Sequence, residues 1–100
     1  MPRPRPADES SLAAFLAAHP EWGRDQDGLV RTYEAPTFLD GIAFVDRVAA
    51  LAEAEDHHPD IDIRWRRVRL RFVTHDAGNE ITEIDVRLAA ACDELFPAHR

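Results

Sequence analysis

Residues 61–75, IDIRWRRVRLRFVTH, constrain the fold more than any other part of this 100-residue chain. Apolar and charged side chains alternate on both sides of a central pair of arginines, which is the period-two pattern of half-buried strands. The parity of the apolar set changes between Trp65 and Val68. Such a change is expected where a two-residue turn joins antiparallel strands. We therefore predict a hairpin that turns at Arg66-Arg67, with Trp65 in the core.

The register of this hairpin predicts which side chains meet. With this turn, Asp62 lies opposite Arg71 on the polar face, where the two can form an ion pair. Extended to the open end of the hairpin, the same register places His58 opposite His75. Because His57 precedes His58 directly, three imidazoles are expected at one end of the sheet. The carboxylates expected beside them are those of Glu53, Asp56 and Asp76.

Three helices are predicted from capping residues and from apolar side chains at helical spacing, over residues 10–19, 37–55 and 82–96. Thr37 and Thr82 are each followed three residues later by an aspartate, a variant of the capping box. The buried face of the second helix is predicted to consist of Phe38, Ile42, Val45, Ala49 and Ala52. A further hairpin is indicated by the turn sequence Asp27-Gly28, with Trp22 before it and a β-favouring run after it.

The predicted order of elements is helix, two strands, helix, two strands, helix. This order favours an α+β fold, in which a four-stranded antiparallel sheet has three helices packed on one face and arginines and carboxylates on the other. Residues 9–100 are long enough for a single domain with one modest core. Residues 1–8 contain three prolines, and we predict that they form a disordered N-terminal tail.

Composition excludes several classes of function. All 12 basic residues are arginine, so neither a Schiff-base lysine nor a P-loop can be present. The net charge of −7 argues against binding to nucleic acid or to anionic membranes, and no apolar run is long enough to span a membrane. The one cysteine, Cys92, is expected to be a buried small hydrophobe without a disulfide partner. The expected compartment is the cytoplasm.

The histidine cluster favours acid–base chemistry. Near its unperturbed pKa of about 6.5, imidazole can both donate and accept a proton at neutral pH. A zinc site built from imidazole and carboxylate is the alternative. Because adjacent histidines lack the spacing that puts two ligands on one face of a helix, we favour the acid–base interpretation over a metal site. His19 and His99 lie apart from the cluster in sequence and are expected to be ordinary surface residues.

The spacing of these residues resembles the signature of a known family. Glu-x3-His-His-Pro-x5-Trp-x9-His-x9-Asp runs from Glu53 to Asp85 and is similar to the signature of the pterin-4a-carbinolamine dehydratases. Trp22 and the stretches DGLVRTYEAPTF, AFVDRVAALAE and THDAG also resemble family sequences. The resemblance covers about residues 10–96, and the tandem His-His-Pro makes it specific.

The resemblance implies dehydration of 4a-hydroxytetrahydropterin, the product of aromatic amino acid hydroxylation, to the quinonoid dihydropterin. It implies that His57 and His75 form the acid–base pair and that His58 positions the pterin, with no metal or cofactor. Substrate-binding roles are expected for Glu53, Asp56, Pro59 and Asp76. Supporting roles are expected for Trp65, as scaffold, and for Asp85, as a helix cap.

Family members assemble as dimers or tetramers, so a homodimer or homotetramer is expected, with an aromatic amino acid hydroxylase as a partner in the same pathway. The alternative is a non-catalytic binding or assembly module on the same fold. Some animal members are dimerisation partners of a homeodomain transcription factor, and other relatives that have lost catalytic residues act in Rubisco assembly. The retention of all three histidines favours the enzyme.

Overall fold

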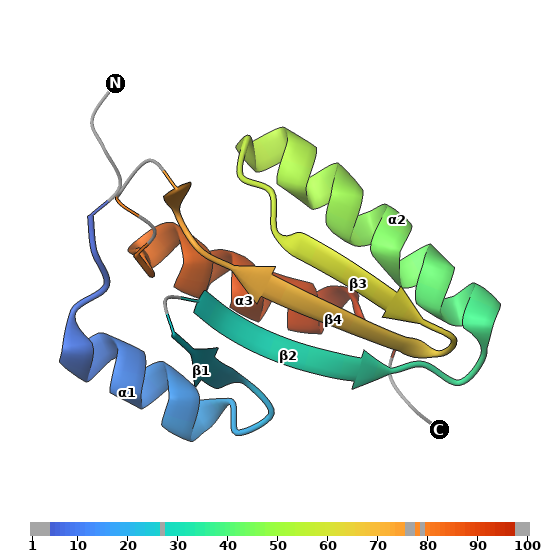
Figure 1. Ribbon diagram of the computed structural model, residues 1–100, viewed down its shortest axis with the longest axis horizontal. Helices are drawn as coiled ribbons and strands as arrows, with labels where there is room; N and C mark the ends of the chain where they lie inside the picture. The colour runs from blue at the N-terminus through green and yellow to red at the C-terminus, as the bar shows by residue number, and fades with distance from the viewer. Residues whose placement is uncertain (1–4, 27, 76–77, 79, 98–100) are drawn as a thin grey trace.

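A four-stranded antiparallel sheet carries three helices on one face in the computed structural model (Figure 1), which describes residues 5–26, 28–75, 78 and 80–97. The predicted fold class is therefore confirmed. The elements are α1 (Glu9–Ala18), β1 (Gly23–Asp25), β2 (Gly28–Glu34), α2 (Phe38–Glu55), β3 (Asp60–Arg64), β4 (Arg67–Phe72) and α3 (Glu83–Leu95). The strand order is β1-β2-β4-β3, so β4 lies inside the sheet and β3 at its edge.

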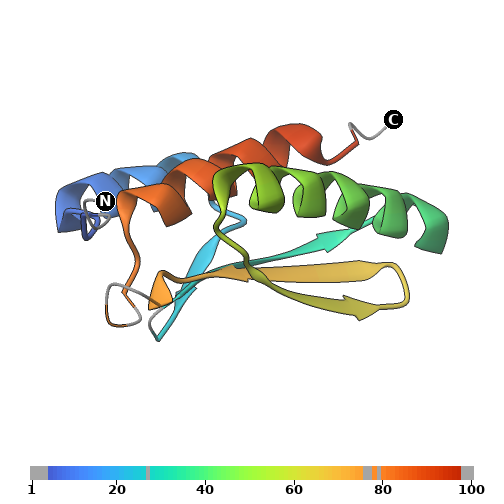
Figure 2. The same cartoon turned by 90° about the horizontal axis from the view of Figure 1, so that it is seen from above.

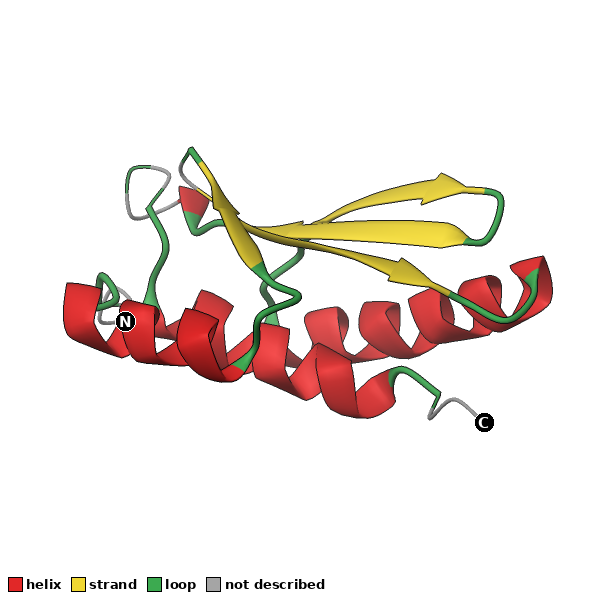
Figure 3. Ribbon diagram, turned by 90° about the horizontal axis from the view of Figure 1, so that it is seen from below, coloured by secondary structure: helices red, strands yellow, loops and turns green. Residues whose placement is uncertain are grey.

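Figures 2 and 3 show the sheet and the helix layer edge-on. The core lies between these two layers. On β4, Val68, Leu70 and Phe72 are buried under the helices, while the arginines between them face away from the core. Phe44 of α2 and Cys92 of α3 are fully buried on the helix side. The alternation in the sequence thus separates one apolar face from one charged face. Within the described residues, no helix is long and apolar enough to cross a membrane.

α2 has the predicted ends but a different buried face. The Thr37 side chain accepts a hydrogen bond from the Asp40 backbone N–H at 3.0 Å and caps the helix. The buried residues are Gly41, Phe44, Val48 and Ala52. Of the predicted set, Ala52 is buried and Val45 is partly buried against the core. Phe38 is 47% exposed. Gly41 faces the sheet, where an added Cβ would lie 3.5 Å from Val68, at ordinary van der Waals distance.

The β3–β4 hairpin turns one residue earlier than predicted. Arg64 pairs with Arg67 and Ile63 with Val68, so the turn is Trp65-Arg66. Trp65 has a φ of 55° and is 71% exposed, so its predicted place in the core was wrong. The register is shifted by two residues, which leaves every other side chain on its predicted face. Asp60, rather than Asp62, lies opposite Arg71, at 3.7 Å.

The position of this turn follows from the contacts of Arg66. Its Nη1 donates to the carbonyl of Ala35 at 3.1 Å, and its Nη2 donates to Glu34 at 2.9 Å. The carbonyl of Arg66 in turn accepts from the Ala35 N–H at 2.9 Å. These bonds tie the turn to the end of β2, while the Trp65 ring lies outside against the Arg66 guanidinium.

The predicted N-terminal tail is partly ordered. The Ala7 N–H donates to the Ile81 carbonyl at 2.9 Å, and the Glu83 N–H donates to the Arg5 carbonyl at 3.1 Å. Asp8 then caps α1, in place of the predicted Ser10 or Ser11. Backbone pairing with the start of α3 thus gives residues 5–8 hydrogen-bond partners, despite the low helix and strand propensity of a proline-rich segment. Residues 1–4 lie outside the described part of the chain.

Candidate active site

The end of α2 sets the directions of the two adjacent histidines. Asp56 follows the helix in the left-handed conformation, with φ 52° and ψ 44°, which aspartate tolerates better than most residues. Its backbone N–H and that of His57 both donate to the carbonyl of Ala52. The chain is therefore reversed immediately before His57, in the manner of a helix C-terminal motif.

His57 is held by a buried carboxylate from another helix. Its Nε2 lies 2.6 Å from Asp85 Oδ1, and its ring is parallel to that of Phe72. Asp85 is fully buried at the start of α3, where it forms the predicted capping box with Thr82. An ionised carboxylate can only accept, so His57 Nε2 carries the proton and Nδ1 is the ring nitrogen left to exchange one.

His58 is paired with a carboxylate in solvent. Its Nε2 lies 2.6 Å from Oε2 of Glu53, which is in the last turn of α2. Both side chains are exposed. The Glu53 carboxylate, which was expected beside the histidines, thus contacts one of them. Because the pair is exposed, it orients His58 only weakly.

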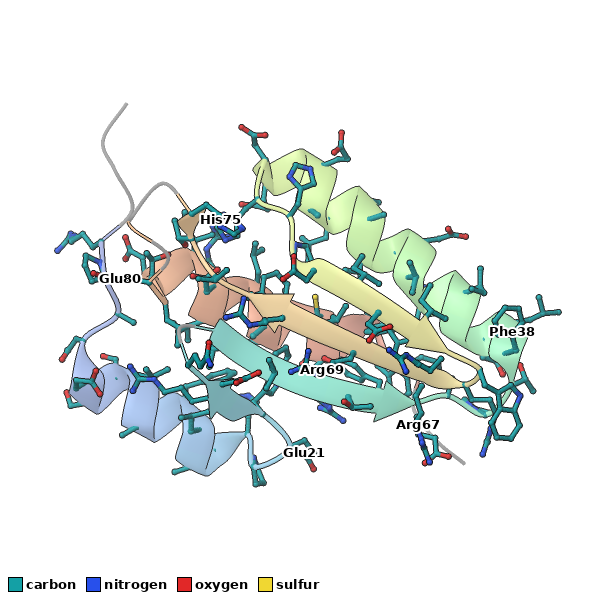
Figure 4. All side chains as sticks on the ribbon, in the orientation of Figure 1. Glu21, Phe38, Arg67, Arg69, His75 and Glu80 are labelled. Carbon is teal, nitrogen blue, oxygen red and sulfur yellow. The ribbon has the colours of Figure 1, made fainter. Side chains whose placement is uncertain are left out.

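One shallow cavity of about 180 Å³ brings the three histidines together. It is lined by Asp56, His57, His58, Val73, Thr74 and His75. Figure 4 shows His75 just past the end of β4, at the end of the hairpin opposite to Phe38 and the turn. The strand ladder stops at Asp60 and Arg71, so His58 and His75 meet across the cavity and not as a paired position. Two other cavities border residues 5–8 and α1: one of about 200 Å³ that also involves Arg24 and Ile81, and one of about 330 Å³ that also involves α3. Their linings among the described residues contain no histidine.

The other predicted site residues differ in where they lie. Asp56 lines the cavity, whereas Pro59 is half-buried between His58 and β3. Asp76 lies outside the described residues. Trp65 is at the turn, away from the histidines. Among the described residues, no group of three or more His, Cys, Asp or Glu is arranged to hold a metal ion.

Sequence reasoning missed Thr74 and one role of Asp85. Thr74 is buried and donates to Asp85 Oδ2 at 2.7 Å. The sequence contains a signal for it, since Thr74 continues the inward parity of Leu70 and Phe72, and an inward-facing polar residue needs a partner. Asp85 was explained by its helix cap alone. Its contact with His57 joins residues 28 positions apart, which no local pattern predicts.

Comparisons with known proteins show which family the chain resembles. A family model described as pterin 4 alpha carbinolamine dehydratase matches residues 5–95. A Chloroflexus aurantiacus protein with the provisional name pterin-4-alpha-carbinolamine dehydratase is 52% identical over 96 residues, covering 96% of this chain and 99% of that protein. A Mycolicibacterium smegmatis protein with the same provisional name is 59% identical over 83 residues, covering 83% of this chain and 87% of that protein.

Two solved structures share the fold. A transcriptional coactivator/pterin dehydratase from Brucella melitensis superposes with a TM-score of 0.84 at 25% identity, covering 93% of this chain and all of that one. A pterin dehydratase-like protein identified as a RuBisCO assembly factor in the alpha-carboxysome gives 0.62 at 23% identity, covering 78% and 89% of the two chains. The family match over nearly the whole sequence and the high identity to its relatives lead to one conclusion: the chain belongs to the pterin-4-alpha-carbinolamine dehydratase family.

Proposed function

We propose that this protein dehydrates 4a-hydroxytetrahydropterin to the quinonoid dihydropterin by histidine acid–base catalysis, in pterin recycling. The observation that carries the proposal is the cavity in which His57, His58 and His75 meet, with His57 bonded to the buried Asp85. Family membership supports the reaction class. The substrate would come from an aromatic amino acid hydroxylase, whose reaction produces the 4a-hydroxyl compound.

Loss of water requires two proton transfers. One group removes the proton on N5 of the pterin, and another protonates the C4a hydroxyl so that the C4a–O bond breaks and water leaves. The N5=C4a double bond then forms. We assign the base to His57, because the Asp85 carboxylate at its Nε2 stabilises the imidazolium that forms when Nδ1 accepts a proton. His75, on the same cavity, is assigned as the acid.

The remaining residues would bind and orient the pterin. His58, held by Glu53 on the exposed side of the cavity, would position the ring from that side, and Asp56 would contribute to the rim. Pro59 would fix the backbone between His58 and β3, since its ring restricts φ. A binding role for Asp76 stays a prediction from the sequence. The cavity is smaller than the roughly 300–1,000 Å³ of typical ligand pockets, so a bound pterin would stay partly exposed.

The test is stopped-flow measurement of the dehydration of 4a-hydroxytetrahydropterin. We expect His57→Ala and His75→Ala each to reduce the catalysed rate by roughly a hundred-fold or more, the size of a lost general acid or base. The matched control is His19→Gln, because His19 stacks on Phe15 at the end of α1 and does not line the cavity. Unaltered rates in both cavity variants would rule out the mechanism.

We also propose that the protein self-associates through β3. In the described chain, β3 is an edge strand, so its outer backbone groups lack a strand partner. Its apolar residues Ile61 and Ile63 remain partly exposed on the helix side of the sheet. A second copy that pairs along β3 would satisfy both features. Sedimentation of the native protein should give a dimer or tetramer, and Ile61→Asp should shift it toward the monomer.

A binding or assembly module is the second candidate function. Phe38, Leu39 and Trp65 are exposed near the hairpin turn, away from the histidines, and one structural neighbour is identified as a RuBisCO assembly factor. If the wild-type protein fails to dehydrate the carbinolamine while keeping its fold, this second function is favoured. Full activity in a Trp65→Ser variant would separate the apolar surface from the catalytic cavity.

A further inference from the structure

Thr74 is a buried polar residue between the segment that carries His75 and the Asp85 carboxylate that holds His57. It follows β4, precedes His75 directly and is 3% exposed. Its backbone N–H donates to the carbonyl of Glu80 at 2.9 Å, which fixes the strand at the end of the sheet where Figure 4 shows His75 and Glu80. Its hydroxyl points into the interior, where it lies 2.7 Å from Asp85 Oδ2 and 2.7 Å from Thr82 Oγ1.

The hydrogen bonds around Asp85 indicate which groups donate and which accept. Oδ1 faces His57 Nε2 at 2.6 Å, while Oδ2 accepts from the Thr82 N–H at 2.9 Å and from the Thr74 hydroxyl. A hydroxyl has a single proton, and Thr74 gives its own to Asp85, so Thr82 is the donor in the bond between the two hydroxyls. The result is a directed series from Thr82 through Thr74 to the carboxylate, all of it buried.

The two threonines do not contribute equally. Thr82 lies in the same turn of α3 as Asp85, and its hydroxyl is 3.4 Å from Oδ2, so its main contribution is the backbone bond of the helix cap. Thr74 comes from the sheet, and its hydroxyl bond is the shorter one. It therefore connects the strand that carries His75 to the carboxylate that holds His57.

We propose that Thr74 is a positioning residue that acts through Asp85: by donating to Oδ2 it keeps Oδ1 directed at His57 and so holds His57 in the Nε2-protonated tautomer. The catalytic consequence rests on the proposed dehydratase function, because it requires that His57 exchange its proton through Nδ1. The tautomer itself does not depend on that function. Without the Thr74 hydroxyl, the Thr82 N–H remains as a donor to Oδ2 but the bond from the sheet is lost. The carboxylate is then held less firmly, and Nδ1-protonated His57 becomes populated.

The experiment compares Thr74→Val, which removes the hydroxyl and keeps the shape, with Thr74→Ser, which restores the hydroxyl. Thr32→Val, on the exposed face of β2, is the matched control. The side-chain ¹⁵N shifts of His57 report its tautomer, and steady-state kinetics report the catalytic consequence. In Thr74→Val we expect the shifts to move toward a mixture of tautomers and kcat to fall by about ten-fold with little change in KM, the effect of losing one hydrogen bond to a charged group.

Thr74→Ser should recover both readouts, and Thr32→Val should leave both unchanged. A wild-type tautomer in Thr74→Val overturns the proposal, whatever the activity. An inactive wild-type protein removes the proposed dehydratase function and leaves the tautomer measurement to decide the role of Thr74. Thr74→Ala is measured in parallel, with amide spectra as the check of folding. If neither variant folds, the hydroxyl is required for the fold and the positioning role is overturned.

Discussion

His57 and His58 are neighbours in sequence and each lies 2.6 Å from a carboxylate, yet their surroundings differ. The side chains of His57 and Asp85 are 13% and 0% exposed, whereas those of His58 and Glu53 are 55% and 78% exposed. Coulomb interactions are far stronger in the interior than in water, and salt screens exposed pairs first. At the same distance, therefore, the buried pair of His57 and Asp85 is firmly held, whereas the exposed pair of His58 and Glu53 is loosely held. The two histidines of these pairs are adjacent in the chain.

The difference arises from where each carboxylate comes from. Glu53 is on the helix that leads directly into His58, and the two residues are only five positions apart. Asp85 reaches His57 only when α3 packs beside the end of α2, and its other oxygen is then held by the Thr82 N–H. We infer that the local pair adjusts to the substrate, while the tertiary pair is preorganised.

The largest expected effect is on catalysis in Asp85→Asn. The amide can donate to His57 Nε2 and favour the wrong tautomer, so the dehydration rate should fall by about a hundred- to a thousand-fold, in line with loss of an orienting carboxylate. Stopped-flow kinetics provide the measurement. Asp46→Asn, at an exposed position of α2, is the control and should keep the wild-type rate. A rate within a few-fold of wild type in Asp85→Asn would remove the distinction between the two pairs.

The free energy of unfolding should also distinguish Asp85 from Glu53. Asp85→Asn loses charge-assisted bonds in a dry environment, and we expect it to lower the free energy of unfolding by about 2–3 kcal/mol. Glu53→Gln should change it by less than about 1 kcal/mol, as is usual for exposed pairs. Urea unfolding followed by tryptophan fluorescence gives both values. Similar losses in the two variants would mean that burial does not distinguish the pairs.

A third carboxylate, Asp93, extends the comparison to the core. It accepts hydrogen bonds from Trp22 Nε1, Arg31 and Tyr33. Burial, followed by the charge of Asp93, raises the pKa of Cys92 from 9.0 to about 12. Burial and the hydrogen bond to Asp93 likewise raise the pKa of Tyr33. Both groups thus stay neutral in the folded protein at pH values where they ionise in the unfolded chain.

The sign of the pH dependence follows from these raised pKa values. The stabilisation is fully present below the unfolded pKa of Cys92 and is lost as the pH rises toward the folded one. The free energy of unfolding should fall above about pH 9, by up to about 1.4 kcal/mol per pH unit for each group. Cys92→Ala should make the decline shallower in urea titrations between about pH 8 and 10.5. An equally steep decline in that variant would show that Cys92 is not a source of it.

The fold was predictable because its signals are local. The parity of residues 61–72 identifies the buried face of the sheet, and Thr37 and Thr82 cap their helices as expected. The register of the hairpin was not predictable from this pattern. A shift by two residues preserves the face of each side chain, and the contacts of Arg66 with residues 34–36 that fix the turn are tertiary.

The gathering of the three histidines was predictable from the sequence, whereas the residues that support them were not. The spacing of His57, His58 and His75 identified the residues that line the cavity. Which histidine is buried depends on the left-handed Asp56 and on the packing of α3, and neither has a signature in the sequence. Thr74 was visible as a polar residue at an inward position, but its partner lies 11 residues away in another element.

The smallest expected effect is that of Glu53→Gln on catalysis. Exposed pairs contribute at most about 1 kcal/mol, so kcat/KM should fall by no more than about five-fold. Because ions screen the wild-type pair, the difference between the two proteins should shrink as salt rises from about 0.05 to 0.5 M. Asp85→Asn should keep its full defect over the same range, since its environment excludes ions. A Glu53→Gln defect that is large and independent of salt would mean that Glu53 contacts the pterin itself, and the exposed pair would then belong to the catalytic machinery as fully as the buried one.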